Sequence, residues 1–191
     1  MRSDEILPIV KENCPSCHTP LEPEVQECPN CQFSFEKAEA YFADRSYATE
    51  MDAPVVDQSK ALRMKEKQEI LDLLAGFRKV LPDLFLAIYL EDRGEEADSM
   101  GLWLHNVLEF RFLPNYVTPQ YGLLLYIDTK HQNVSLSYGL GLTPYLRQRI
   151  VRRLLEPAVV AFGQAEYVTG VRILCDNLIT HFTEECQLTA S

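Results

Sequence analysis

The stretch GLLLYIDTKHQNVSLSYGLGL, residues 122–142, carries the clearest prediction of the fold. It begins with a continuous apolar run, residues 122–127, which is typical of a strand buried on both faces of a sheet. A turn is predicted over residues 130–133, and residues 134–138 alternate in polarity as in a half-buried strand. The stretch therefore predicts a hairpin with one strand deep inside a sheet.

The sequence upstream of this hairpin predicts two further strands and two helices. A buried strand is expected over residues 84–90 (LFLAIYL), and a short one over residues 54–56. Apolar side chains recur at helical spacing over residues 59–81 and again over residues 100–108, with a charged loop before the second helix. Strands that alternate with helices predict an α/β domain whose sheet is covered on both faces.

The sequence downstream of the hairpin predicts two closing helices. Thr143 can cap the first of them, with Pro144 in its first turn, and Pro157 is expected to bend or restart that helix. The last helix carries apolar residues on one face from Tyr167 to Phe182.

A separate motif, CPSCHTPLEPEVQECPNC, spans residues 14–31 and predicts a metal site. Its two C-x2-C pairs supply Cys14, Cys17, Cys28 and Cys31, and four thiolates suit the tetrahedral preference of zinc. So short a segment has too few large apolar side chains to fold without a metal. We expect a closed, structural zinc site with no open position for catalysis.

Other chemistries fit the same cysteines and stay open at this point. A redox C-x2-C pair, two disulfides, or iron in place of zinc are the alternatives, and His18 could replace one thiolate. Each C-P-x-C unit resembles the knuckle of short zinc ribbons found at the start of bacterial proteins. In those ribbons a glycine usually follows each pair, where this chain has His18 and Gln32.

Length, charge and cysteine usage limit the classes of function. The chain has 191 residues and a formal net charge of −10, which disfavours binding to nucleic acid or to an anionic membrane surface. The first ten residues do not have the pattern of a signal peptide, and x2-spaced cysteines in an unexported chain indicate metal rather than disulfides. We expect a cytoplasmic protein with a zinc ribbon at 8–35, an acidic linker with one or two helical turns at 36–53, and a main domain at 54–186.

The main domain resembles the TPM family, which includes a thylakoid-lumen phosphatase-like protein. Three stretches carry the likeness: PVVDQ at 54–58, the hairpin at 122–142, and EPAVVAFGQAEYVTGVRILCDNLI at 156–179. No single motif among them is specific, but their order and spacing together are. The resemblance implies an αβα sandwich with a central mixed sheet.

The resemblance also implies a candidate ligand site, because some TPM proteins are reported as weak acid phosphatases or calcium binders that use loop carboxylates. Asp57 matches the first acid of the family, and Asp128 lies beside the acids of its hairpin. This chain departs from the pattern at Ser137, where the family has an acid, and at Lys130 and His131 in the hairpin turn. Structural roles are equally consistent with the two acids: a helix N-cap for Asp57 and a turn residue for Asp128.

One basic cluster lies on the predicted helix after the hairpin: Arg147, Arg149, Arg152 and Arg153. These arginines either form a solvated face that pairs with Glu156 or form a docking patch for an acidic partner.

The sequence thus predicts a non-enzymatic interaction or adaptor protein with an unknown protein partner, one structural zinc ion and a degenerate TPM domain. The alternative is a weak metal-dependent phosphatase, or a calcium-binding TPM domain, that uses Asp57 and Asp128. The sequence leaves the oligomeric state open.

Overall fold

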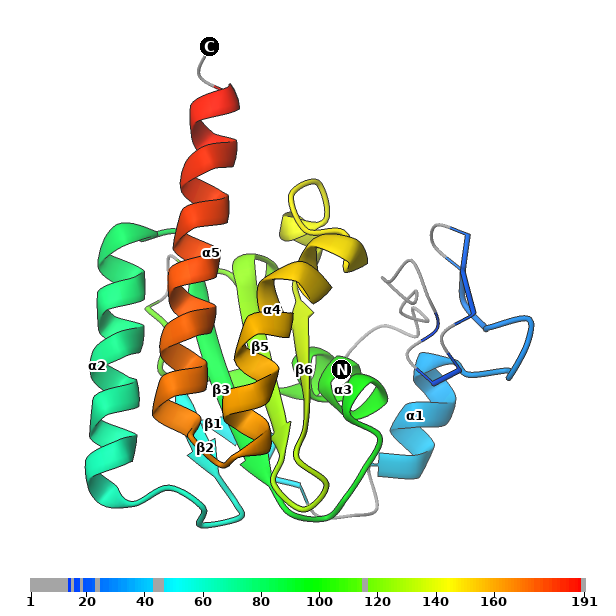
Figure 1. Ribbon diagram of the computed structural model, residues 1–191. Helices are drawn as coiled ribbons and strands as arrows, with labels where there is room; N and C mark the ends of the chain where they lie inside the picture. The colour runs from blue at the N-terminus through cyan, green and yellow to red at the C-terminus, as the bar shows by residue number, and fades with distance from the viewer. Residues whose placement is uncertain are drawn as a thin grey trace.

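A computed structural model describes residues 14, 16–17, 19–22, 25–42, 47–114 and 117–189. Its centre is a four-stranded sheet in the order β2-β3-β5-β6 (Figure 1). The strands are β2 (Val55–Asp57), β3 (Phe85–Glu91), β5 (Gly122–Asp128) and β6 (Asn133–Tyr138). The first three are parallel and β6 is antiparallel to β5, so the sheet is mixed.

The two central strands, β3 and β5, are the apolar runs that the sequence singles out. All residues of both strands are buried, as expected for strands with neighbours on either side and helices over both faces. The 3-10 turns η2 (Pro119–Tyr121) and η3 (Leu140–Leu142) flank the β5–β6 hairpin.

Three helices, α2 (Met64–Val80), α4 (Gln148–Gly163) and α5 (Tyr167–Thr189), lie side by side over one face of the sheet (Figure 1). They enclose what we call the first core, which includes Ile70, Leu90, Leu125 and Leu174. The opposite face carries α3 (Ala97–Val107), which encloses the second core with Tyr89, Tyr126 and Trp103. Helices on both faces of a mixed sheet confirm the predicted α/β sandwich.

The N-terminal segment reaches the second core through the helix α1 (Phe35–Phe42). The buried side chains of α1 include Phe42, whose ring centroid lies 5.3 Å from that of Trp103. Tyr47 approaches the same indole at 5.6 Å. A two-stranded parallel sheet of β1 (Glu50–Met51) and β4 (Glu109–Phe110) follows. The segment 36–53, predicted as a linker with one or two helical turns, therefore contains α1 and β1 and contributes side chains to the second core.

Three local expectations need correction. The helix predicted from residue 59 begins at Met64, because Lys60 has φ 57°, a left-handed conformation that a helix cannot include. The helix after the hairpin begins at Gln148, with Arg147 as its N-cap, and Thr143 instead ends the turn η3. Pro157 lies inside one continuous α4 and does not restart it.

None of the helices in the described part of the chain combines the length and apolar character needed to cross a bilayer.

Candidate functional site

The four predicted cysteines converge at one point in the N-terminal segment. Cys14, Cys17, Cys28 and Cys31 hold their Sγ atoms within 4.8 Å of one another, and all four are free thiols. The Cys14–Cys31 and Cys17–Cys28 Sγ separations are 3.5 and 3.7 Å. Sulfurs about 2.3 Å from a tetrahedral zinc lie about 3.8 Å apart, so these residues fit a single metal ion.

Each cysteine pair is placed by the same backbone arrangement. The N–H of Cys14 donates to the carbonyl of Thr19, and the N–H of Cys28 donates to that of Phe33, both at 2.8 Å and both five residues along the chain. Gln32, which follows the second pair, has φ 61°. This is the left-handed conformation that glycine adopts most readily, which accounts for the glycine that ribbons usually have there. The corresponding His18, considered above as a ligand, lies outside the described residues.

The surroundings of the thiols differ between the buried and the open side of the cluster. Burial raises the pKa of the Cys14 thiol to about 12. The hydroxyl of Thr19, 3.2 Å from Cys17 Sγ, is the main cause that lowers the pKa of Cys17 to about 5. The backbone N–H of Ser16 also points at Cys14 Sγ, at 3.4 Å. The thiol of Cys17 donates to the Thr19 hydroxyl, which can turn and donate to the sulfur once Cys17 is ionised. Hydrogen bonds to sulfur stabilise the thiolate form that a metal requires.

Asp57, the first predicted acid, ends β2 and organises the loop that follows. Its Oδ1 accepts from the hydroxyl of Ser59 at 2.8 Å and from the N–H of Ala61 at 3.2 Å, and its Oδ2 accepts from the N–H of Leu62 at 2.9 Å. This capping role resembles the predicted helix N-cap, but it acts on the loop, because α2 begins only at Met64.

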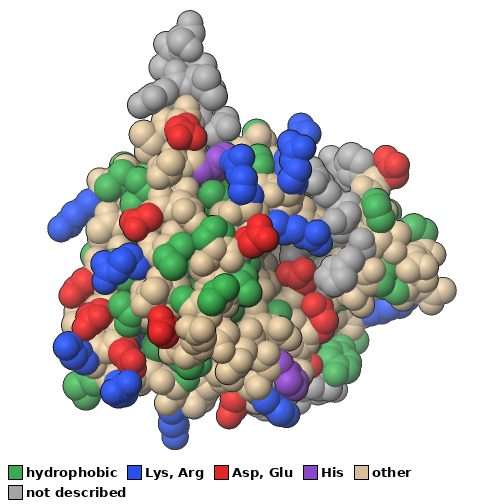
Figure 2. All heavy atoms as spheres, viewed as in Figure 1, with side chains coloured by type: hydrophobic (Ala, Val, Ile, Leu, Met, Phe, Trp, Pro, Cys, Tyr) green, Lys and Arg blue, Asp and Glu red, His purple; other side chains and the backbone are tan. Residues whose placement is uncertain are grey.

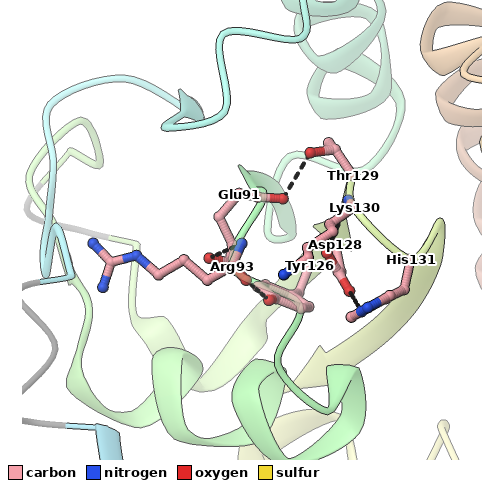
Figure 3. Close-up of polar contacts among 7 residues, drawn as sticks. All are labelled: Glu91, Arg93, Tyr126, Asp128, Thr129, Lys130 and His131. Carbon is pink, nitrogen blue, oxygen red and sulfur yellow. Dashed lines mark hydrogen bonds and ion pairs between the residues drawn. The ribbon is translucent and has the colours of Figure 1, made fainter.

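Asp128, the second predicted acid, ends β5 and is fully buried. Its Oδ1 accepts from the N–H of Lys130 at 3.0 Å, which is the turn role predicted from the sequence. Its Oδ2 lies 2.9 Å from Nδ1 of His131, whose ring is half exposed (Figure 3).

The structure does not bring the two predicted acids together. Asp57 is in register with Leu90, which lines the first core, whereas Asp128 is in register with Glu91, whose strand neighbour Tyr89 lines the second core. Residues in register on adjacent strands share a face, so the two carboxylates lie on opposite faces of the sheet. A pair of carboxylates separated by a sheet cannot ligate one cation.

Sequence reasoning missed Glu91, which the structure places beside Asp128. Glu91 is 2% exposed, and burial raises the pKa of its carboxyl group. The hydroxyl of Tyr126 donates to its Oε1, and the N–H of Arg93 donates to its Oε2 at 3.1 Å (Figure 3). The sequence does carry a signal: both central apolar runs, FLAIYLE and GLLLYID, end in an acid.

The loops after β3 and β5 pack around this pair of acids and are hydrogen-bonded to each other. The backbone N–H and the hydroxyl of Thr129 both donate to the carbonyl of Glu91, at 2.8 and 2.9 Å. Gly94 has φ 79°, and a Cβ built on it would come within 2.3 Å of the His131 ring. Each of the four carboxylate oxygens of Glu91 and Asp128 therefore has a donor or a ring nitrogen from the protein itself.

A neighbouring contact ties the N-terminal segment to the same end of the sheet. The hydroxyl of Tyr47 donates to Glu95 Oε1 at 3.1 Å, and the guanidinium of Arg93 lies 4.4 Å from the centre of the Tyr47 ring. Burial, with Glu95 and Glu91 adding to it, raises the pKa of Tyr47 above its usual range, so this hydroxyl stays a donor.

The fold and the cysteine cluster define this chain as an α/β sandwich with a four-cysteine module at its N-terminus. Its sequence matches no protein-family model, and no curated protein is found as a relative. Among solved structures it is similar to the N-terminal domain of a P. gingivalis protein, with 16% identity, a TM-score of 0.50, and coverage of 69% of this chain and 83% of that chain. It also matches the N-terminal domain of the cg2496 protein from Corynebacterium glutamicum, with 9% identity, a TM-score of 0.49, and coverage of 66% and 78%. At this level of identity the similarity to the P. gingivalis domain concerns the fold alone.

Proposed function

We propose that this protein is a non-enzymatic adaptor, in which a structural zinc ribbon and a degenerate TPM domain act together in binding a protein partner in the cytoplasm. The observation that carries the proposal is the separation of Asp57 and Asp128 onto opposite faces of the sheet. Metal-assisted phosphoryl chemistry needs carboxylates that converge on one cation. Within the described residues, the four cysteines are the one group of three or more His, Cys, Asp or Glu side chains close enough to share a metal ion.

Zinc is the metal that the cysteine cluster fits best, because four thiolates at tetrahedral spacing are its usual structural ligand set. Such a site is closed, so it stabilises a fold and does not activate water. The free thiols, with no disulfide among them, are consistent with a reducing compartment.

The assignment of the main domain to the TPM family rests on the sequence likeness of residues 54–186. The departure at Ser137 has a structural counterpart, because Ser137 is buried against α3. A Cβ placed on Gly101 of α3 would come within 3.2 Å of its hydroxyl, so Ser137 lies close to the α3 backbone and the longer acid that the family carries would press against that helix. This packing supports the loss of metal-dependent chemistry in this chain.

An adaptor needs a fixed presentation of its binding surfaces, and the contacts of α1 supply one. The ribbon at 8–35 leads directly into α1, whose Phe42 packs on Trp103 of α3. We propose that the segment 36–53 acts as a docking arm, which holds the ribbon against the domain at 54–186.

A photo-crosslinking experiment tests the adaptor role. A crosslinking amino acid replaces Gln26, which is exposed on the cysteine module, and in a matched variant it replaces Lys79, which is exposed on α2. In cells that naturally make the protein, we expect the Gln26 position to capture one protein species that the Lys79 position does not.

The alternative activity is tested on the same purified protein by a calcium titration of the melting temperature and by a phosphomonoester hydrolysis assay. The adaptor proposal predicts no response to calcium and no turnover. A calcium-dependent rise in melting temperature that disappears in Asp57→Asn or Asp128→Asn, together with phosphate release, would replace the proposal with the phosphatase alternative.

A further inference from the structure

The four cysteines of the N-terminal module are unequally open to solvent. Cys14 and Cys28 are buried, Cys17 is half-buried, and Cys31 is exposed. The module projects from the side of the main domain, as Figure 2 shows, so solvent surrounds much of it. A small dissolved molecule therefore reaches the sulfur of Cys31 more easily than the other three.

Hydrogen bonding further distinguishes Cys31 from the half-buried Cys17. The side-chain amide of Asn30 donates to Cys17 Sγ at 3.5 Å, and the Thr19 hydroxyl lies 3.2 Å from the same sulfur. In the described part of the chain, no N–H or hydroxyl group hydrogen-bonds Cys31 Sγ. A thiolate that donors stabilise is a weaker nucleophile, so Cys31 is both the more accessible and the more reactive of the two.

A second sulfur lies beside Cys31 on its buried side. Cys14 Sγ is 3.5 Å from Cys31 Sγ, and the contact joins the two C-x2-C pairs. The sulfurs of a disulfide lie about 2.0 Å apart, so a small movement would bring these two within bonding distance. Bound zinc would hold both as thiolates, the form of cysteine that reacts with oxidants.

The backbone connects this cluster directly to α1. The N–H of Cys28 donates to the carbonyl of Phe33 at 2.8 Å. The next residue, Ser34, accepts at its hydroxyl the N–H of Lys37, in the first turn of α1, at 3.2 Å. The second cysteine turn therefore ends where α1 begins, and α1 covers Trp103 in the second core. A loss of metal at the cysteines should loosen this contact.

We propose that Cys31 is an oxidation site through which a peroxide releases the zinc ion and detaches α1 from α3. The Cys31 thiolate attacks one peroxide oxygen, the O–O bond breaks, and the leaving hydroxide takes a proton to become water. The Cys14 thiolate then attacks the resulting sulfenic acid, the S–S bond forms, and a second hydroxide leaves and is protonated to water. The two sulfurs have then given two electrons to the peroxide, and zinc, left with two thiolates, dissociates.

This inference rests on the zinc ribbon of the proposed function, to which it adds regulation. In the reduced protein the docking arm holds the ribbon against the main domain. In the oxidised protein the ribbon has lost its metal and the arm its fixed position, so a peroxide would end the joint presentation of the two binding surfaces.

The test treats the purified, zinc-loaded full chain with hydrogen peroxide. A metallochromic dye follows free zinc, and the emission of Trp103 is recorded in parallel. We expect release of about one equivalent of zinc, together with a shift of the emission to longer wavelength. Dithiothreitol with added zinc should reverse both changes, because a disulfide and a sulfenic acid are reducible by thiols.

Two variants and one mapping experiment locate the reaction. Cys31→His keeps four zinc ligands and removes the exposed thiolate, so it should release zinc at least about tenfold more slowly. Cys175→Ala removes a buried thiol outside the module and should release zinc as fast as the unchanged protein. Differential alkylation and mass spectrometry of the unchanged protein, after about one equivalent of peroxide, should find a disulfide between Cys14 and Cys31.

Three results would overturn the proposal: zinc retained in excess peroxide, a first disulfide other than Cys14–Cys31, or zinc release that leaves the Trp103 emission unshifted. Purified protein that holds no zinc would overturn this inference together with the proposed ribbon. Zinc that is bound but that peroxide does not release would overturn this inference alone. Crosslinking from Gln26 in untreated cells is independent of the oxidation, so its failure counts against the adaptor role.

Discussion

Glu91 and Asp128 lie in register at the carboxyl ends of two adjacent parallel strands, and both are buried on the α3 side of the sheet. Two neighbouring carboxylates repel each other when both are ionised, and burial removes the hydration of each. Both effects cost free energy of folding, so the structure must offset them. The donors from Tyr126, Arg93 and Lys130 do so. The pair is therefore expected to act on stability, and the first two predictions measure that effect.

Replacing Tyr126 by Phe removes the hydroxyl that donates to Glu91. The variant should lose about 1–3 kcal/mol of unfolding free energy, because a buried acceptor is left unsatisfied. The Tyr126 bond lowers the pKa of Glu91, so its removal should cost more at pH 8 than at pH 5. Urea unfolding at both pH values measures this, with the exposed Tyr121→Phe as control. An equal loss at the two pH values would show that Glu91 is not the group affected.

The raised pKa of Glu91 predicts the direction of a pH dependence. Burial is its main cause, and the negative charges of Asp128 and Glu95 add to it. A group whose pKa is higher in the folded protein stabilises the fold below its unfolded pKa, about 4.3 for Glu, and loses that contribution as pH rises through the folded pKa. The unfolding free energy should accordingly fall with rising pH from about 4.3 upward.

The variant Glu91→Gln should lack this component, since the amide does not titrate. The measurement is urea unfolding at half-unit steps from pH 4.5 to 8, with Glu69→Gln, a partly exposed residue of α2, as the matched control. Parallel pH profiles for Glu91→Gln and the unchanged protein would contradict the prediction.

Two glycines should respond in opposite directions to the same substitution. Gly94 has φ 79°, and its added Cβ would meet the His131 ring, so Gly94→Ala should destabilise the protein by about 1–2 kcal/mol or more. Gly76 is exposed in α2 with open space around it, so Gly76→Ala should stabilise by about 0.5–1 kcal/mol. Thermal unfolding of both variants against the unchanged protein provides the comparison. A melting temperature of Gly94→Ala that equals or exceeds that of the unchanged protein would show that residue 94 tolerates a side chain, and a lower one for Gly76→Ala would contradict the prediction for α2.

The sequence predicts β3 and β5 well because burial on both faces makes each strand apolar throughout, and such a run needs no knowledge of its neighbours. It cannot predict that Asp57 and Asp128 lie on opposite faces. That outcome depends on the register between strands, and a shift of one residue reverses the face of every side chain. Glu91 was missed for a related reason: in the sequence it begins the charged stretch 91–99, which reads as a loop. In the structure it is the last residue of β3 and is buried.

Other features depend on backbone conformations or long-range contacts that residue types do not reveal. Lys60 and Gln32 adopt left-handed conformations without being glycine, which displaces the start of α2 and completes the second cysteine turn. The packing of Phe42 on Trp103 joins residues 61 positions apart in the sequence, so no local sequence pattern could predict it.

That long-range contact makes Trp103, the single tryptophan, a reporter of the cysteine module. Cys14→Ser removes a buried thiol of the proposed zinc site, so bound metal should fall from about one equivalent to below about 0.1, because three thiolates would hold zinc far less tightly. Without its metal the module has no core of its own, and the adjoining α1 should partly detach. Trp103 then loses Phe42 as a neighbour, and its emission should shift to longer wavelength. The first core does not involve α1, so far-UV circular dichroism should change little.

Elemental analysis and fluorescence measure both effects, with Cys175→Ala, a buried cysteine of α5 distant in sequence from the module, as the control. Full metal retention in Cys14→Ser, or metal loss in Cys175→Ala, would mean that the four cysteines do not form the site.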